Sequence, residues 1–336
     1  MKLIDKLEMQ SPMIQAPMAG VTTPEFVAAA AEAGILGSIG AGYLSAEQTR
    51  KFIREVKELT EKPFAVNLFI PEQVEMNEEV LRQANAALQP VRDELGITGA
   101  AVALSETEFH KQIQVIVEEN VEICSFTFGL PHQETIQLLK ESDVFLIGTA
   151  TTVDEALLAE RVGMDAVVAQ GSEAGGHRGS FHGELTFIPL HKLLLGTVKA
   201  VGIPVIAAGG IANKEQMEKV LAVGAAAVQI GTALLASDES GAHPQYKQAI
   251  LKAEEGCTAF TTAFSGKTAR GISNRFMKEL EKANIAPYPY QNDLTKEIRK
   301  VAAVQGKSEF ISLWAGKSVH LSVEGKVKDI IHQFYK

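Results

Sequence analysis

The residues with the clearest chemical potential lie in one glycine-rich stretch, QGSEAGGHRGSFHG, at positions 170–183. Five of its fourteen residues are glycine, and Glu173, His177, Arg178 and His182 stand among them. Near neutral pH a histidine can accept or donate a proton, so His177 is a candidate general base or acid. Arg178 could contact an anion or pair with Glu173. The stretch therefore predicts a loop that wraps a ligand and presents His177 to it.

Two other interpretations of this loop are open from the sequence. Glu173, His177 and His182 could bind a metal ion together, although their loose spacing lacks the preorganisation of an H-E-x-x-H helix. His177 could instead be a solvated loop residue without a function. We predict that there is no metal site and that His177 is catalytic.

Eight short apolar runs in the sequence each end in glycine or in a polar segment. They lack regular polar alternation, which is typical of parallel strands buried on both faces. Helical patterns with a polar first residue and a terminal glycine lie between several of them, at 23–34, 152–163 and 213–224. The alternation predicts a (β/α)8 TIM-like barrel, with a doubly wound open sheet as the structural rival. The predicted strands span residues 13–18, 36–41, 64–69, 121–128, 143–150, 165–170, 203–210 and 226–232.

Two segments depart from this alternation. Residues at about 71–112 are rich in helical pattern and separate the third strand from the fourth, so we predict a helical insertion there. Residues 233–336 follow the eighth strand and carry mostly helical patterns with turn-rich interruptions. We therefore predict an α/β barrel over residues 1–232 and a mostly helical substrate-side domain over 233–336, part of which packs back on the barrel.

The bulk composition excludes several classes of protein. A net charge of −9 in 336 residues argues against binding to nucleic acid, which requires a basic face. No apolar run reaches about 18 residues, so we expect no membrane span. The only cysteines, Cys124 and Cys257, have no spacing typical of a metal site or disulfide framework. With no signal-peptide pattern at the start, these features predict a cytoplasmic protein and leave its oligomeric state open, a homodimer included.

Glycine clusters at the ends of the predicted strands, which face the active site in a barrel of this kind. AAGGIAN and QIGT follow the seventh and eighth strands, where such barrels often bind a phosphate. Either loop alone could be a tight turn, but the pair favours a phosphate site. Its backbone N–H donors would come from Gly209, Gly210, Gly231 and Thr232.

A phosphate site in this place fits FMN better than a dinucleotide. No Walker-type GxxxxGK[ST] occurs, and GSIGAG at 37–42 lacks the G-x-G-x-x-G spacing. Asn67 and Gln170 are polar residues at the ends of otherwise apolar strands, and they could hydrogen-bond the polar edge of a flavin ring. Ordinary capping of the strand ends is the alternative for both residues. We predict FMN as the cofactor.

Six segments spread over nearly the whole chain carry a family likeness: IQAPMAGVTTPEF, VNLF, QGSEAGGHRGSF, AAGGIAN, QIGTALLASDESGAHPQYKQAI and FSGKTARGISNRF. They resemble the nitronate monooxygenase family, formerly called 2-nitropropane dioxygenases, and its class I branch in particular. The resemblance implies a TIM-like barrel with an additional mostly helical domain and non-covalently bound FMN. It also implies oxidation of an alkyl nitronate, such as propionate 3-nitronate, by molecular oxygen to a carbonyl compound and nitrite.

The resemblance also assigns roles to individual residues. His177 falls on the family's catalytic histidine, and Lys267 stands where many relatives carry arginine. Asn67, Gln170, Gly175, Gly210 and the run from Gln229 to Thr232 fall on FMN-binding motifs. Together with the strand-end loops, the predicted cofactor-binding set is Ala16, Pro17, Met18, Asn67, Gln170, Gly175, Gly176, Gly209, Gly210, Gln229, Ile230, Gly231 and Thr232.

Flavin-dependent NAD(P)H enoyl-acyl carrier protein reductases of the same superfamily are the main alternative, because they share a similar EAGGH loop and an AAGGI strand end. SFTFGLP, SGKTARGISNRF and PYPYQNDL resemble the nitronate enzymes instead. A flavin-binding protein without turnover and a flavin-free phosphosugar enzyme are the remaining alternatives. For an anionic nitronate, Arg178 and Lys317 are candidate contacts. Tyr288, Tyr290 and Trp314 are candidates for the entrance or for packing.

Overall fold

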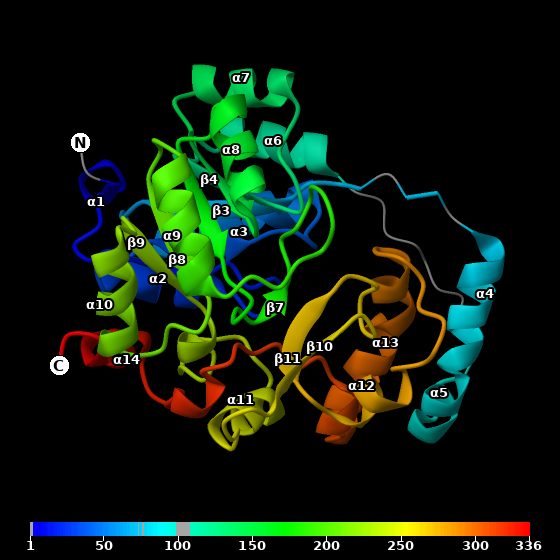
Figure 1. The fold of residues 1–336 in the computed structure, drawn as a ribbon. Helices are drawn as coiled ribbons and strands as arrows, with labels where there is room; N and C mark the ends of the chain where they lie inside the picture. The colour runs from blue at the N-terminus through cyan, green and yellow to red at the C-terminus, as the bar shows by residue number, and fades with distance from the viewer. Residues whose placement is uncertain (1–2, 73, 76, 99–107) are drawn as a thin grey trace.

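The computed structural model describes residues 3–72, 74–75, 77–98 and 108–336 of the chain. Its centre is a parallel sheet with the strand order β1-β9-β8-β6-β5-β4-β3-β2, curled into a barrel (Figure 1). The ring closes between β1 and β2, where Gln15 donates its backbone N–H to the carbonyl of Leu36 at 2.8 Å. This closure rules out the open sheet. The strands are β1 (Met13–Gln15), β2 (Gly37–Gly40), β3 (Phe64–Phe69), β4 (Ile123–Thr127), β5 (Phe145–Ala150), β6 (Ala166–Gln170), β8 (Val205–Ala208) and β9 (Ala227–Ile230), all within their predicted ranges.

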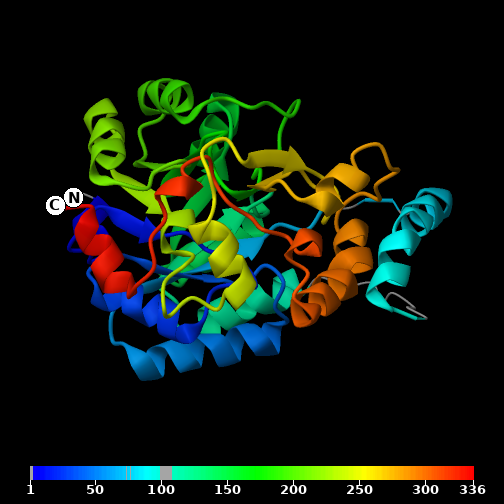
Figure 2. The same ribbon diagram turned by 90° about the horizontal axis from the view of Figure 1, so that it is seen from below.

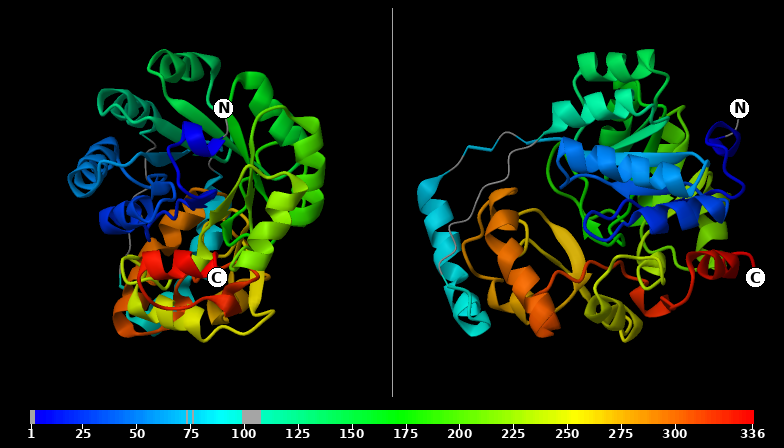
Figure 3. Two further views of the ribbon diagram at one scale, coloured as in Figure 1. Left: turned by 90° about the vertical axis from the view of Figure 1, so that its left-hand side faces the viewer. Right: turned by 180° about the vertical axis from the view of Figure 1, so that it is seen from behind.

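Helices surround these strands as a ring (Figure 3, left). Their termini carry the expected signals: the Thr23 hydroxyl accepts the N–H of Phe26 at the start of α2, and Gly163 ends α8 at a left-handed φ of 101°. The three predicted helices are therefore confirmed. The barrel helices are α2 (Pro24–Glu32), α3 (Ala46–Leu59), α6 (Phe109–Glu118), α7 (Gln133–Glu141), α8 (Val153–Val162), α9 (Leu190–Ala200) and α10 (Lys214–Val223). A short helix, α1 (Leu3–Lys6), precedes β1.

The predicted insertion at about 71–112 contains two kinds of structure. Helices α4 (Glu78–Ala87) and α5 (Gln89–Leu95) pack against α13 (Tyr290–Gln305), away from the barrel (Figures 1, 2 and 3). The last four residues of the predicted insertion, 109–112, belong instead to α6, which packs on α3 and β3 as a barrel helix. Residues 73, 76 and 99–107 of the insertion lie outside the described ranges.

Beyond β9 the chain contains helices and a small sheet. Strands β10 (Thr258–Thr261) and β11 (Ala269–Ile272) are antiparallel, and β11 also pairs with β7 (Gly176–His177) from the glycine-rich loop. The prediction of mostly helical structure did not include this sheet, which joins the loop after β6 to the C-terminal part of the chain. The remaining elements are α11 (Pro244–Leu251), α12 (Arg275–Glu279), α14 (Val327–Gln333) and the 3-10 turns η1 (Thr232–Leu234), η2 (Ser308–Phe310) and η3 (Val319–Leu321).

Different hydrophobic clusters support these two parts, and a third cluster, which includes Ile14, Val168 and Ile206 of the barrel strands, adds to the barrel. The first fills the layer between the barrel strands and their helices, with Phe26 and Phe126 fully buried in it. The second joins α5 to α11, α12 and α13, where the rings of Phe264 and Phe276 stack at 4.5 Å between centroids. Among the helices in the described ranges, none combines the length and apolar character that a bilayer crossing requires. The loops at the carboxyl ends of the barrel strands lie between the barrel cluster and the cluster of α5, α11, α12 and α13.

Candidate active site

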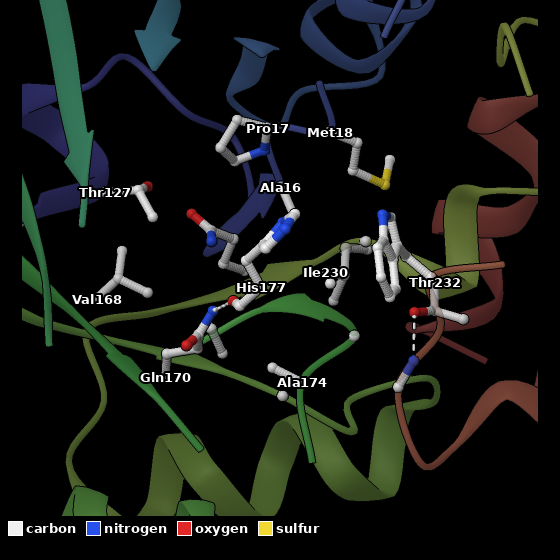
Figure 4. A pocket seen from close by; sticks show the side chains of 18 of the residues that line it. Ala16, Pro17, Met18, Thr127, Val168, Gln170, Ala174, His177, Ile230 and Thr232 are labelled. Carbon is white, nitrogen blue, oxygen red and sulfur yellow. Dashed lines mark hydrogen bonds between the residues drawn. The ribbon is translucent and has the colours of Figure 1, made fainter. Parts of the chain in front are cut away.

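A cavity opens at the C-terminal ends of the barrel strands, between the barrel and the segment after β9 (Figure 4). It contains about 1330 Å³ of empty space when the solvent at its open mouth is included. His177 and every residue of the predicted cofactor set line this one cavity. They come from the loop after β1 (Ala16, Pro17, Met18), from β3 (Asn67), from the end of β6 and its loop (Gln170, Gly175, Gly176), from the loop after β8 (Gly209, Gly210) and from β9 and its end (Gln229, Ile230, Gly231, Thr232).

The glycine loops after β8 and β9 present unpaired backbone donors to this cavity. None of the described residues accepts a hydrogen bond from the N–H of Gly210, Gly231 or Thr232. Gly209 and Gly210 have φ angles of 125° and 69°, which side-chain-bearing residues rarely adopt. Helix α10 starts shortly after Gly210 and adds a partial positive charge. The residues present therefore fit an anionic group such as a phosphate.

A C-terminal segment, residues 314–318, seals this end of the cavity. The N–H of Gly316 donates to the Thr232 hydroxyl at 3.0 Å, and the Ser318 hydroxyl donates to the carbonyl of Gly210 at 2.7 Å. Sequence reasoning did not single out Gly316 or Ser318 as cavity residues. Lys317 is exposed and does not line the cavity, so its side chain is not placed to contact a ligand there.

The loop that carries His177 is held from inside by Gln170 and Arg178. The Gln170 amide donates to the carbonyl of His177 at 3.0 Å and accepts the N–H of Gly179 at 2.9 Å. The Arg178 guanidinium, 2% exposed, donates to the carbonyls of Gln170 and Gly171, both at 2.9 Å. Arg178 thus fastens the loop, and it is not among the residues that line the cavity.

A second anchor of the loop, Glu155 in α8, was not found by sequence reasoning. Its side chain is fully buried, and its carboxylate accepts the N–H groups of Phe181 at 2.6 Å and His182 at 3.0 Å. The other oxygen accepts both the N–H and the hydroxyl of Thr151, at 2.5 and 2.8 Å. In the sequence Glu155 looks like an ordinary acidic residue in the first turn of a helix.

His177 itself lies in an aromatic chamber. Its ring centroid is 5.4 Å from that of Trp314, 5.7 Å from Phe128 and 6.5 Å from Tyr288. The only ring hydrogen bond among the described residues joins Nε2 to the Ser265 hydroxyl, at 2.8 Å. Sequence reasoning did not single out Ser265.

The pKa of His177 is strongly lowered, and burial is the largest cause. Together with the positive charges of Arg299 and Lys267, it lowers the pKa of His177 from 6.5 to about 3. The imidazole is therefore neutral near neutral pH, as a general base requires.

The candidate entrance residues divide into two groups. Trp314 lines the cavity and Tyr288 packs beside His177, whereas the Tyr290 hydroxyl donates to the carbonyl of Val74 at 3.2 Å and belongs to the packing. Lys267 forms an ion pair with Glu72, and its ammonium lies 4.6 Å from the centroid of the Phe128 ring. Lys267 thus places a cation beside the aromatic chamber.

The three side chains considered for a metal site point to different partners. The Glu173 carboxylate accepts the N–H of Leu190 at 2.8 Å, His177 contacts Ser265, and His182 is exposed. Within the described ranges, no group of three or more His, Cys, Asp or Glu side chains is arranged to hold a metal ion.

These features define a (β/α)8-barrel protein with its ligand cavity at the carboxyl ends of the strands. The model of the nitronate monooxygenase family matches residues 1–336, so the chain belongs to the nitronate monooxygenase family. This is a family of oxidoreductases that are in general flavin-dependent and act on small molecules. The resemblance seen in the sequence motifs is therefore confirmed.

Similar proteins agree with this assignment. A probable nitronate monooxygenase of Staphylococcus haemolyticus (strain JCSC1435) is 45% identical over 340 residues, which cover 98% of this chain and 94% of that protein. One from Staphylococcus aureus (strain JH9) is 44% identical over 327 residues, covering 96% and 92%. Among solved structures, nitroalkane oxidase from Streptomyces ansochromogenes has a TM-score of 0.93 at 37% identity, covering 99% and 96%. FabK from Thermotoga maritima has a TM-score of 0.78 at 33% identity, covering 99% and 94%.

Proposed function

We propose that this chain is an FMN-dependent enzyme that oxidises alkyl nitronates, such as propionate 3-nitronate, with molecular oxygen to a carbonyl compound and nitrite. The observation that carries the proposal is one cavity that combines N–H donors at Gly210, Gly231 and Thr232, unpaired within the described ranges, with a half-buried neutral base, His177. Membership of the nitronate monooxygenase family and the similarity to a nitroalkane oxidase support it.

The predicted residues divide the binding of FMN between its two ends. The N–H groups after β8 and β9 would hold the phosphate. Asn67 donates through Nδ2 to the hydroxyls of Ser125 at 2.9 Å and Thr127 at 3.2 Å, which leaves its amide oxygen without a donor among the described residues. That oxygen and the Gln170 amide would meet polar atoms of the flavin ring. When bound, FMN would supply the capacity to accept electrons from the nitronate.

His177 would serve as the base that converts a neutral nitroalkane into its nitronate. Because its pKa lies well below neutrality, the imidazole would be unprotonated at physiological pH, which is the state from which a base acts. The same low pKa disfavours the alternative in which an imidazolium holds the anion in the resting enzyme. Lys267 and Arg299, whose positive charges act on His177, would instead attract an anionic substrate toward the chamber.

We also propose that the two parts of the chain have different functions. The barrel over residues 1–232 would bind FMN, and a mostly helical domain over 233–336, joined by α4 and α5, would shape the substrate side. The separate hydrophobic cluster of α5, α11, α12 and α13 supports this division. We also propose a cytoplasmic enzyme, in keeping with two cysteines that form no disulfide, and a homodimer as its assembly.

Anaerobic mixing of the purified protein with propionate 3-nitronate, and separately with NADPH, tests the function. Bleaching of the flavin absorbance by the nitronate alone, followed by nitrite formation when oxygen is admitted, is the expected result. Bleaching by NADPH alone would instead indicate an enoyl-acyl carrier protein reductase. A colourless protein that does not bind added FMN, or FAD as the cofactor released by acid, would refute the proposed cofactor site.

A further inference from the structure

The Ser265 hydroxyl lies at the centre of three contacts that decide where the proton of His177 sits. It approaches His177 Nε2 at 2.8 Å, it accepts the N–H of Lys267 at 3.3 Å, and it can donate to the carbonyl of Lys267 at 3.1 Å. A serine hydroxyl has one proton to donate and two lone pairs that accept. The direction of the bond to His177 therefore follows from the other two contacts.

Only one assignment satisfies all three contacts. If the hydroxyl donates to the carbonyl of Lys267, its lone pairs accept the N–H of Lys267 and an Nε2–H of His177. If it donates to Nε2 instead, the carbonyl of Lys267 loses its only donor among the described residues. Ser265 is 2% exposed, so its hydroxyl has little access to water as a further donor or acceptor. Hydrogen-bond accounting therefore places the proton on Nε2.

We propose that Ser265 is a positioning residue that holds His177 as the Nε2–H tautomer and leaves Nδ1 as the basic atom of the site. Nδ1 has no hydrogen-bond partner among the described residues, and His177 lines the cavity. The rings of Phe128, Tyr288 and Trp314 surround the imidazole and restrict its reorientation. The inference rests on the proposed function, because it concerns the base in that reaction.

The tautomer has a direct consequence for proton transfer. The C–H bond at the α-carbon of the nitroalkane breaks, its proton moves to Nδ1, and its electron pair moves into the nitro group to give the nitronate. His177 becomes an imidazolium while Nε2–H still donates to Ser265, so no hydroxyl has to turn during the step. A base acting through Nε2 would have to break the bond to Ser265 and reverse its direction.

Nuclear magnetic resonance on the flavin-loaded protein labelled with ¹⁵N-histidine tests the tautomer directly. The ring nitrogens of His177 are identified as the signals that disappear in His177→Asn. We expect a proton on Nε2 and a chemical shift at Nδ1 that is characteristic of an unprotonated ring nitrogen. A proton on Nδ1 at neutral pH would overturn the inference. This readout does not depend on turnover.

The variant Ser265→Ala tests the positioning role, and Thr261→Ala is its matched control. The Thr261 hydroxyl accepts the N–H of Ala263 at 3.0 Å, a local bond like that of Ser265, but it does not contact His177. We expect Ser265→Ala to lower kcat/KM for nitroethane about tenfold, as the loss of one hydrogen bond allows. Activity with preformed ethyl nitronate should fall less, and the ring should show both tautomers.

Two results would contradict the positioning role: an unchanged tautomer in Ser265→Ala, or an equal loss of activity in Thr261→Ala. Failure of the proposed function would be recognised separately, because propionate 3-nitronate would then not bleach the flavin. In that case the ring-nitrogen spectrum would still report whether Ser265 sets the tautomer of His177.

Discussion

The side-chain amide of Gln170 donates a hydrogen bond to the main-chain carbonyl of His177, at 3.0 Å. The same amide accepts the N–H of Gly179 at 2.9 Å, so one side chain from the end of β6 holds the loop on both sides of the imidazole. Gln170 also lines the cavity, where we propose a contact with the flavin. Under the proposed function, Gln170 would therefore couple cofactor binding to the placement of the base.

We expect Gln170→Leu to destabilise the loop and reduce turnover together. Leucine is close in size but makes neither hydrogen bond, so the free energy of unfolding should fall by about 1–3 kcal/mol. Because the base is then poorly placed, kcat should fall more than KM rises. Urea unfolding and steady-state kinetics measure the two effects. Gln137→Leu is the control, since Gln137 is exposed and its side chain bonds only Glu141 among the described residues; equal behaviour of the two variants would contradict the coupling.

Replacement of His177 should affect the activities with a neutral nitroalkane and with a preformed nitronate differently. His177→Asn should keep the fold and the FMN, because the loop is held by main-chain contacts and by other side chains. Activity with a neutral nitroalkane should fall about a hundredfold or more, since removal of the carbon-bound proton requires a base. Activity with the preformed nitronate should fall less. Near wild-type turnover of both substrates would exclude His177 as the catalytic base.

The lowered pKa of His177 predicts how stability depends on pH. The unfolded chain gains a proton near pH 6.5, whereas folded His177 gains it only at about 3. Between these values the unfolded state binds more protons, so the contribution of His177 to stability is complete above 6.5 and is lost as the pH falls toward 3. Urea unfolding at about pH 7 and about pH 4 should show a larger acid loss in the wild type than in His177→Asn. Identical losses would contradict the depressed pKa.

Substitutions in the two glycine loops would test different properties, stability at Gly210 and phosphate binding at Gly231. Gly210 has a φ of 69°, and an added Cβ would lie 2.9 Å from the Cβ of Glu173, so any side chain at Gly210 should cost stability outright. Gly231 has a φ of −123°, and its added Cβ would meet the Cβ of Ala16 at 3.2 Å, a tight contact at the cavity wall. Gly231 is therefore the cleaner probe of the phosphate site.

Gly231→Val should weaken FMN binding about tenfold to a hundredfold, which is the effect of losing hydrogen bonds to a charged group. The melting temperature without FMN should change little by comparison. Gly202→Val is the control, because an added Cβ at Gly202 meets only the Glu160 carboxylate at 3.3 Å, outside the cavity. Equal FMN affinity in wild type and Gly231→Val would contradict a phosphate beside this loop.

The sequence predicted the barrel well because buried parallel strands have a simple signature. Residues 166–169, for example, are all apolar and are followed by Gln170 and Gly171, so both the position of the strand and its functional end can be predicted. The strands β7, β10 and β11 were missed for the opposite reason. β7 is only a glycine and a histidine, and the short strands β10 and β11 mix polar residues with apolar ones, so none of the three contains an apolar run.

The contacts that position His177 were less accessible to sequence reasoning. Ser265 lies 88 residues from His177, and Glu155 lies 26 residues from Phe181, so neither pair leaves a local pattern. From the sequence, an arginine in a glycine-rich loop suggested a contact with an anion. Its burial could not be predicted, because it depends on how the loop folds over the guanidinium. Types of residue and strand ends indicate which side chains meet at a barrel mouth, but the direction of each hydrogen bond requires the folded loop.

The last prediction concerns Glu155, whose buried carboxylate is surrounded by donors. It accepts hydrogen bonds from the N–H groups of Thr151, Phe181 and His182 and from the Thr151 hydroxyl. In Glu155→Gln an NH₂ group replaces one of the accepting oxygens and must face N–H donors. We expect the free energy of unfolding to fall by about 1–3 kcal/mol, or by more because a charged acceptor is lost.

Since Phe181 and His182 follow the loop that carries His177, the damage from Glu155→Gln should reach the active site. Turnover of a neutral nitroalkane should fall, and the ¹⁵N signals of His177 should broaden, because the imidazole would occupy more than one position. Glu160→Gln is a matched control on the same helix: the Glu160 carboxylate accepts the N–H groups of Gly202 and Ile203, outside the cavity. We expect Glu155→Gln to change stability, turnover and the ¹⁵N signals of His177, as measured by denaturant unfolding, kinetics and magnetic resonance. We expect Glu160→Gln to change stability alone. A fully active Glu155→Gln with unaltered His177 signals would mean that Phe181 and His182 are held without this carboxylate and that His177 depends on Gln170, Arg178 and Ser265 alone.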